Sequence, residues 1–586
     1  MEVLGSVRDY RKYLPEYEDW QNQQELNNAQ KVEYLKQNPD KFNKDDIQRG
    51  KILLHAIDIM DEYSQSNAED MEVATEFAKG QIVGIATMIG MLGGTLAALT
   101  KPVQKALQKV AGKGNGAMFV AQMLPSAIGM MVGFAASFPA IMWATKTKIS
   151  ASRKGRFEAM RKDLNNPAIF AVLTEEQTKK VDAEAKSVVL DDKTQKRLKN
   201  KSSMGANPLD SIKTLKKYYS NNEEYNIQKK EFDEKLKESE QNFDKQLSEE
   251  QIRKAKHDQQ ILAHMVRKMD LASQDYAENT ELATNTLIAL SLAGGGLVGW
   301  VSNKLIKLLK VGTASKFTKI IPWAVGLAIP LLMNIYAAKL QKQASRIGRY
   351  KAKQEMLNNP ESLVYVDKQD YEKMENVKTP VQPQKPNIFK FFAQLIKDNK
   401  EYNEYRKSAL VEDLKRHKAI ENLDLTPEQQ SDAKALQMNV FKTFNKVDEK
   451  SQTYSESVEA VGEMTKQGVS VFGSLAASGI STWSVMKMLE KPEAVFDNKN
   501  FWQMLPKLLT KTLVPFAFVL LPIILIDIYT TKAQKKASRV ADMLALKELQ
   551  DYRHYAGYSD NFEKNDNKVN AVENSDTNLI NRLKSA

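Results

Sequence analysis

The string Trp143-Ala144-Thr145-Lys146, followed four residues later by Ala151-Ser152-Arg153, decides the architecture of this 586-residue chain because it occurs three times. The second copy begins at Tyr336 and the third at Tyr529, each 193 residues after the copy before it. Every copy ends in Ala-Ser-Arg, and the first two continue to the same Leu-Asn-Asn-Pro sequence. One string that recurs at a fixed interval indicates tandem copies of one structural unit.

Two further markers precede each copy in the same order. His55 and the following Met-Asp pair are matched at equal spacing by His264 and its Met-Asp pair, and Asn439 takes the histidine position in the third copy. Further upstream, a Glu-Tyr pair places tyrosines at Tyr17, Tyr225 and Tyr402. The markers predict three repeats, which span about 1–200, 201–385 and 386–586.

Six long stretches are almost free of acidic and basic residues, and they fall in pairs, one pair in each repeat. A helix needs about 20 apolar residues to cross about 30 Å of hydrocarbon. A buried helix of a water-soluble core seldom runs so long without a charge, and six such runs are hard to explain in that way. The predicted membrane helices are 80–100 and 118–145 in the first repeat, 282–303 and 320–338 in the second, and 467–486 and 512–531 in the third.

The rest of the chain is strongly polar, so that the mean hydropathy is only −0.48. Capping boxes beginning at Thr174, Ser248 and Thr426 mark the starts of polar helices. Alternating runs typical of β-strands are nearly absent. We therefore predict an all-α, polytopic membrane protein of three tandem repeats, each with a transmembrane helical hairpin and long polar amphipathic helices.

The net charge of +12 indicates an anionic partner, either phospholipid or nucleic acid. Many basic residues lie beside the apolar runs and no stacking aromatic residues are interleaved with them, which favours anionic phospholipids and predicts no nucleic-acid partner. The chain has no cysteine and five histidines, none with the spacing of a zinc hydrolase, and it lacks the common nucleotide-binding and nucleophile motifs. We expect no catalytic residue, no metal site and no cofactor, and thus a protein that is not an enzyme.

The repeated aromatic-basic string has a direct physical interpretation at a bilayer surface. Aromatic rings with polar tips lie at the level of the headgroups, and Lys and Arg lay their stems along the apolar edge while their charges reach phosphate. An alternative is that the three Ser-Arg pairs form a specific headgroup or partner site around an axis. The predicted lipid-interface anchors are Trp143, Lys146, Arg153, Tyr336, Lys339, Arg346, Tyr529, Lys532 and Arg539.

Asp527 is the one carboxylate inside a predicted membrane helix, and Asn334 holds the corresponding position in the second repeat. Ionisable side chains inside a membrane are functional candidates by default. Asp527 precedes Lys532 by five residues, so it could equally form a pair near the interface. The two residues are the candidates for an intramembrane polar site.

Three functions remain open at this point. The first is a non-enzymatic integral membrane scaffold, whose three hairpins anchor a polar helical mass that offers surfaces to protein partners. The second is a transporter or channel with pseudo-threefold symmetry, and the third is a delivered membrane-inserting effector. The N-terminal segment lacks an apolar signal region. The segments that follow each second membrane helix carry slightly more Lys and Arg than the loops within the pairs, which favours a plasma (inner) membrane protein with both termini cytoplasmic. Re-entrant hairpins are the alternative topology.

Overall fold

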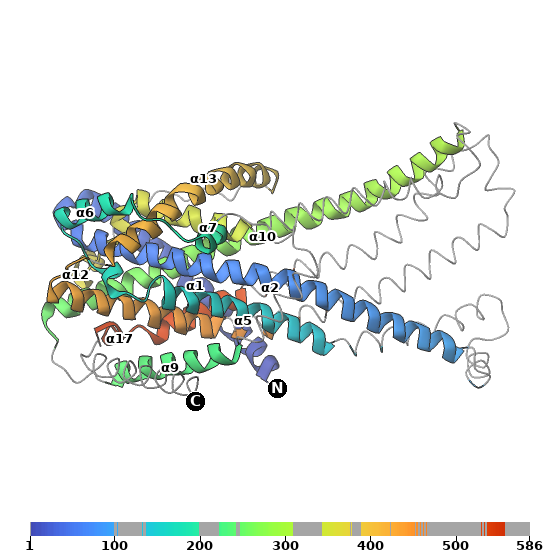
Figure 1. Cartoon of the computed structure of the whole chain (residues 1–586), viewed down its shortest axis with the longest axis horizontal. Coiled ribbons are helices and arrows are strands. Elements are labelled where there is room, and N and C mark those ends of the chain that lie inside the picture. The colour runs from blue at the N-terminus through green and yellow to red at the C-terminus, as the bar shows by residue number, and fades with distance from the viewer. Residues whose placement is uncertain are drawn as a thin grey trace, which may run out of the picture.

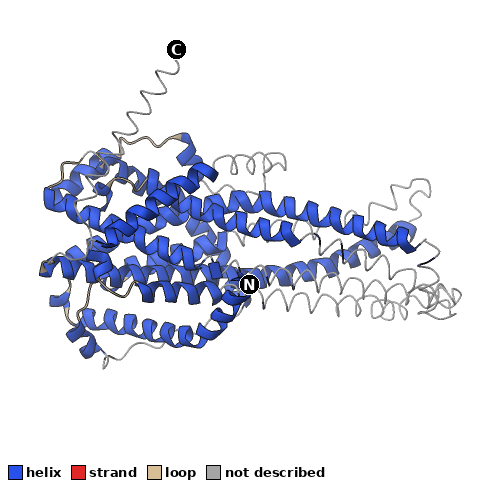
Figure 2. Cartoon of the chain, turned by 90° about the horizontal axis from the view of Figure 1, so that it is seen from below, coloured by secondary structure: helices blue, strands red, loops and turns tan. Residues whose placement is uncertain are grey.

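The structure is a computed structural model, and every regular element that it describes is a helix (Figures 1 and 2). This confirms the predicted all-α class. Apart from a few isolated positions, the described residues are 2–98, 138–198, 222–241, 247–308, 343–374, 388–421, 423–451 and 536–556.

Each repeat contributes three helices to a packed bundle, which we call the head. A lead helix comes first and is followed by the first and second helices of a hairpin. The lead helices are α1 (Glu2–Gln37), α9 (Asn222–Gln241) and α13 (Ile388–Ile420). The first hairpin helices are α2 (Lys44–Ala98), α10 (Glu249–Leu308) and residues 427–451. The second hairpin helices are α5 (Phe138–Lys162), residues 343–358 and residues 536–548.

Short elements close the ends of the hairpins. They are η1 (Pro39–Lys41), η2 (Pro167–Phe170), α6 (Glu175–Ala185), α7 (Asp192–Leu198), η4 (Pro360–Leu363), α12 (Lys368–Met374) and α17 (Arg553–Ala556).

All three predicted capping boxes are confirmed. The Thr174 side chain accepts a hydrogen bond from the Gln177 backbone, and the Gln177 side chain accepts one from the Thr174 backbone. The same exchange joins Ser248 to Gln251 and Thr426 to Gln429. Each box satisfies two backbone donors that a helix start leaves open, which is why the sequence pattern located these starts.

The core of the head forms where the three first helices meet. Leu54 and Met60 of α2, Met265 of α10 and Val440 of the third repeat are fully buried in one apolar cluster. Removing this surface from water, at roughly 25 cal/mol per Å², drives the packing of the repeats. The repeats therefore share one core and do not form three separate ones.

A hydrogen-bonded serine pair fixes the register of each hairpin. The pairs are Ser64 with Ser152 at 2.6 Å, Ser273 with Ser345 at 2.5 Å, and Ser451 with Ser538 at 2.5 Å. This corrects the sequence alignment of the third repeat, because Lys442, and not Asn439, then takes the position of His55 and His264. The identities in that copy were too few to fix the register, whereas a short side-chain contact does.

Glycine permits the closest helix crossing in the first two hairpins. A Cβ atom on Gly155 would lie 2.4 Å from the Tyr63 carbonyl oxygen, and one on Gly348 would lie 2.2 Å from that of Ala272. Neither distance leaves room for a methyl group, so the backbones touch there. The third repeat has Ala541 at this position.

Each lead helix packs on the second hairpin helix of the preceding repeat. Tyr225 of α9 makes an edge contact with Phe157 of the first repeat, with ring centroids 5.3 Å apart. Tyr402 of α13 lies 5.8 Å from Tyr350 of the second repeat. Tyr17 of α1 packs with Val540 and Met543 of the third repeat. The first lead helix therefore closes onto the last repeat, and the head is a ring.

Beyond the head, α2 and α10 continue as single long helices away from the bundle, and we call residues 80–98 and 282–308 the stalk (Figure 1). In the described part of the chain, no helix is both long and apolar enough to cross a bilayer, so the transmembrane part of the predicted fold is not supported there. The predicted spans 320–338 and 467–486 lie outside the described residues, as do nearly all of 512–531 and most of 118–145.

Candidate functional site

Charged side chains gather at the centre of the head, one helical turn from the serine pairs. Each first helix carries an aspartate three residues before its serine, and each second helix carries a charged residue four residues after its serine. At these spacings the side chains share the helix face that carries the serine. The aspartates are Asp61, Asp270 and Asp448, and their counterparts on the second helices are Arg156, Arg349 and Asp542. We call these six residues the axial cluster.

Both arginines of the axial cluster bridge neighbouring repeats. Arg156 Nη2 lies 3.3 Å from Asp61 Oδ1 within its own repeat, and Nη1 forms an ion pair with Asp448 of the third repeat. Arg349 of the second repeat places Nε 3.3 Å from Asp61 Oδ2 of the first. Each second helix thus reaches back to the aspartate of the preceding repeat.

The third repeat breaks this pattern, because an acid faces an acid. Asp542 is only 7% exposed and forms a side-chain hydrogen bond with Asp270 of the second repeat. Burial, and then the charge of Asp270 and the hydrogen bond with it, raise the pKa of Asp542 well above its ordinary value. The raised pKa favours the protonated form of Asp542, which can donate a hydrogen bond to Asp270 where two negative charges would repel each other.

The axial cluster borders a cavity of about 170 Å³. Apolar side chains of all three first helices complete the wall, among them Ile57, Met269 and Val447. Asp542 Oδ1 has no hydrogen-bond partner among the described residues. Over the same residues, no group of three or more acidic or histidine side chains is placed to hold a metal ion. The arrangement can bind a proton and hold three repeats together.

A second ionic cluster joins the three repeats near the starts of the first helices. Arg49 donates from Nε and Nη2 to Asp258 of the second repeat at 2.6 and 2.8 Å, and from Nη1 to Asp432 of the third at 2.7 Å. Asn439 donates to Asp258 at 2.7 Å, and Lys254 Nζ lies 3.6 Å from Asp432. We call these five residues the basal cluster.

The buried pair of the basal cluster is fully ionised. Burial alone would raise the pKa of Asp258, but the charge and hydrogen bonds of Arg49 lower it to about 2. Burial likewise opposes the charge of Arg49, and the two aspartates overcome this and raise the pKa of Arg49 above its ordinary value. Two positive side chains face two negative ones here, so the cluster is balanced.

The structure places two of the predicted anchor arginines between repeats. Arg346 is 4% exposed and donates from Nε to Gln65 of the first repeat at 2.9 Å. Arg539 donates to Gln274 of the second repeat at 2.7 Å and to Asp275 at 2.8 Å. In the second and third repeats, the serine of the Ser-Arg pair therefore bonds within its hairpin and the arginine bonds to the preceding repeat.

The remaining predicted site residues are only partly described. Trp143 is half-buried, Arg153 lines a cavity beside Phe157, Lys146 is exposed, and Tyr529 is 65% exposed. Tyr336, Lys339, Lys532, Asn334 and Asp527 lie outside the described residues. A role of these residues at lipid stays a prediction.

The axial cluster was missed in the sequence although a signal was present. The first two copies read Ala-Ser-Arg-x-x-Arg, and the third replaces the last arginine with Asp542. A charge reversed at one of three equivalent positions indicates broken symmetry. Its partner could not be inferred, because the pairing with Asp270 requires the second helix of the third repeat to lie on the first helix of the preceding repeat.

Comparison of the chain with protein-family models, with curated proteins and with solved structures finds no match.

Proposed function

We propose that the chain is a non-enzymatic membrane scaffold of the plasma (inner) membrane, whose ionically locked head stands on the cytoplasmic side of three inserted hairpins. The observation that carries the proposal is the continuity of α2. This helix of 55 residues begins in the buried core of the head and runs without interruption into the stalk. A rigid element shared by head and stalk holds the head at a fixed position relative to the bilayer.

The exposed face of the α2 stalk supports a lipid partner. Ile82, Ile85 and Ile89 lie on one side of the helix and are 43%, 56% and 65% exposed. A row of uncovered isoleucines is unfavourable in water and marks a surface for protein or lipid. Lys101, Lys105 and Lys109 follow in the sequence and supply the charge that an anionic phospholipid surface attracts.

Cysteine labelling tests the insertion directly, because the chain has no cysteine of its own. Ile85→Cys places a thiol on the stalk, and Val189→Cys, at an 82% exposed position of the head, is the matched control. In sealed liposomes we expect a water-soluble maleimide to label the head variant and to label the stalk variant only after detergent is added. Equal labelling of the two variants in intact liposomes would remove the membrane role.

The axial cavity favours a second candidate, a transporter that moves protons along the pseudo-threefold axis. It places two facing carboxyl groups, Asp542 and Asp270, at the centre of the head, and burial raises the pKa of Asp542. Transport sites need such convergent polar groups. Proton flux into liposomes that falls at least tenfold with Asp542→Asn, but not with the exposed control Asp45→Asn, would support transport. Equal proton flux in the two variants, or no flux, would exclude the transporter and leave the scaffold as the proposed function.

A further inference from the structure

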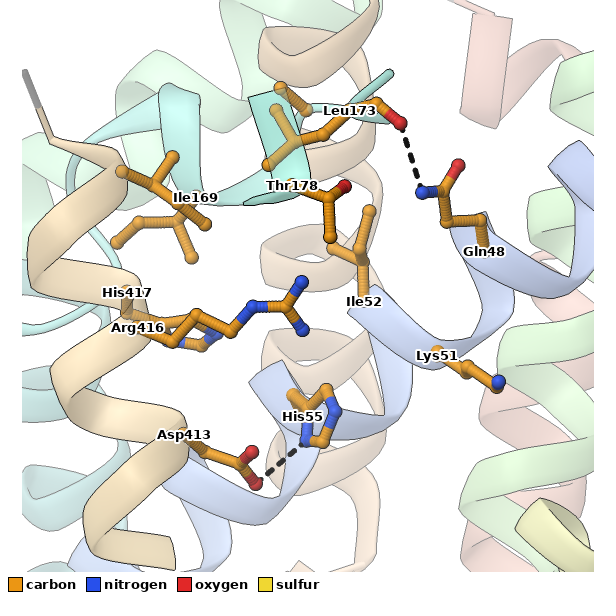
Figure 3. Close-up of a pocket in the computed structure, with 12 residues that line it drawn as sticks. Gln48, Lys51, Ile52, His55, Ile169, Leu173, Thr178, Asp413, Arg416 and His417 are labelled. Carbon is orange, nitrogen blue, oxygen red and sulfur yellow. Dashed lines mark hydrogen bonds and ion pairs between the residues drawn. The ribbon is translucent and has the colours of Figure 1, made fainter. Parts of the chain in front are cut away.

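A cavity of about 250 Å³ lies on the side of the head between α2, α13 and the segment 169–178 (Figure 3). No residue of the axial cluster, the basal cluster or the stalk lines it. It is smaller than most small-molecule sites, which measure about 300–1,000 Å³. A ligand that occupies it must therefore be compact.

One wall of the cavity is apolar. Ile169, Leu173 and Ile420 are each at least nine-tenths buried, and the half-buried Ile52 faces them from α2. This wall would bury the body of an apolar group and gain roughly 25 cal/mol per Å² covered. It offers no hydrogen bond to a fully polar ion.

A cationic group lies opposite this wall. Figure 3 shows the Arg416 guanidinium extending from α13 toward α2, near Thr178 and Ile52, whereas the Lys51 side chain of α2 points away from it. Arg416 Nε lies 2.9 Å from Asp182 Oδ1. The two atoms form an ion pair but not a hydrogen bond, and Nε has no hydrogen-bond partner among the described residues. Asp182 is 56% exposed, so this pair is weak and leaves the guanidinium able to bind another anion.

Asp413 is the one carboxylate among the described residues of the cavity wall, and it already has positively charged neighbours. Asp413 lies 3.0 Å from His55 Nδ1 and 3.6 Å from Lys353 Nζ. Burial would raise its pKa, but the hydrogen bond of His55 and the neighbouring positive charges lower it to about 2. Asp413 therefore stays ionised and paired within the protein.

His417 adds a polar group that the described part of the protein leaves unused. Its side chain is 7% exposed, and Nδ1 has no hydrogen-bond partner among the described residues. Burial, and then the nearby His55, lower the pKa of His417 to about 3, so the ring is neutral at physiological pH. A buried nitrogen without a hydrogen-bond partner is destabilising. A ligand or a bound water that reached this nitrogen would remove that destabilisation.

From these contacts we infer that the cavity binds a small organic monocarboxylate with a short apolar body. The carboxylate pairs with Arg416, and the body packs on Ile52, Ile169 and Ile420. Arginine suits this role because its planar fork presents two parallel donors to a carboxylate. The site lies in the head and does not depend on the proposed membrane role.

Calorimetric titration of the full chain tests the inference with three probes. Benzoate has the charge and the apolar body, benzamide keeps the shape without the charge, and inorganic phosphate keeps the charge without the body. We expect benzoate to bind saturably and at least tenfold more tightly than either, a difference of about 1.4 kcal/mol. No saturable benzoate binding at millimolar concentration, or equal binding of either other probe, would overturn the inference.

Two variants locate the binding in this cavity. Arg416→Gln should weaken benzoate binding at least tenfold, whereas Arg161→Gln, at an exposed arginine of α5, should not change it. Thr178→Phe fills the cavity and should abolish binding while every cationic group is kept. Circular dichroism of each variant confirms that it is folded. Benzoate binding that survives both changes in the cavity would place the ligand elsewhere.

Discussion

The axial and basal clusters both join all three repeats, but they differ in charge balance. The basal cluster sets Arg49 and Lys254 against Asp258 and Asp432, so every buried charge has an opposite partner. The axial cluster sets four carboxyl groups against two arginines, and one contact is Asp542 on Asp270. The first arrangement pairs opposite charges, whereas the second includes a carboxyl–carboxyl contact that protonation of Asp542 favours. Near-symmetric repeats can thus build two junctions of opposite pH response.

The largest expected effect breaks the basal cluster. Asp258→Ala removes both oxygens that receive Arg49 and leaves a buried guanidinium without this partner. Such a loss typically costs about 3–5 kcal/mol. The free energy of unfolding from denaturant titration should fall by that amount, whereas Glu234→Ala, which breaks the exposed pair with Lys230, should change it by less than about 1 kcal/mol. Similar losses of stability in the two variants would show that the buried Arg49–Asp258 pair contributes no more than an exposed pair.

The next effect concerns the helix crossing that brings the axial cluster together. Gly155→Ala would place its Cβ 2.4 Å from the Tyr63 carbonyl oxygen, so the hairpin must open. Overpacking of this kind costs about 1–3 kcal/mol. Gly93→Ala is the matched control, because nothing lies within 4 Å of its Cβ position. The melting temperature should drop for the first variant only, and an unchanged melting temperature for Gly155→Ala would show that the helices do not touch there.

A third experiment sharpens the contrast in pH response. Asp542 has a raised pKa in the folded state, so its proton stabilises the head at low pH and that contribution is lost as the pH rises through the folded pKa. One proton changes the free energy of unfolding by at most about 1.4 kcal/mol per pH unit. Asp542→Asn, which stays neutral, should flatten this alkaline decline in a pH series of unfolding curves. If the free energy of unfolding of the variant declined as steeply at alkaline pH as that of the wild type, another titrating group would be responsible.

Asp258 should respond in the opposite direction. Its folded pKa of about 2 lies below the ordinary value of about 3.9, so its contribution is complete above that ordinary value and is lost as the pH falls toward 2. In the same pH series, Asp542→Asn should leave this loss of stability at acidic pH, the acid limb of the curve, unchanged. An acid limb that disappeared with Asp542→Asn would show that the two clusters do not titrate separately.

The smallest effect concerns the seam of the ring, the exposed contact between Lys536 of the third repeat and Glu18 of the first. Lys536 of the third repeat lies 3.0 Å from Glu18 of α1, and both side chains are about half exposed. Exposed pairs contribute about 0–1 kcal/mol and weaken with salt. Lys536→Gln should therefore lower the free energy of unfolding by a few tenths of a kcal/mol in low salt and by nothing measurable at about 1 M salt. A loss that persisted in high salt would indicate a contact beyond the ion pair.

The sequence predicted what depends on local pattern and not what depends on assembly. Three repeats, the all-α class and the capping boxes follow from strings of neighbouring residues. His55 and His264 match in sequence, yet His55 pairs with Asp413 from α13, whereas His264 lies 3.4 Å from Arg267 of its own helix. Equivalent residues acquired different partners because the ring brings different helices beside them.

The third repeat also shows that contacts between helices cannot be predicted from local sequence. Its serine pair is visible only once the hairpin is folded, so Asn439 was aligned three residues too early. The meeting of Asp542 with Asp270 likewise requires the second helix of one repeat to lie on the first helix of the preceding one. Spacing along one chain segment carries no information on that contact.

Ring closure between the two ends of the chain is the central claim, and one crosslinking measurement tests it most directly. Glu18→Cys and Lys536→Cys place two thiols at the seam in a chain without other cysteines. A short bis-maleimide should join them within a monomer and change its gel mobility, whereas Glu18→Cys paired with Lys180→Cys on α6 should give no such product. Crosslinking no more efficient at the seam than in the control pair would contradict the ring.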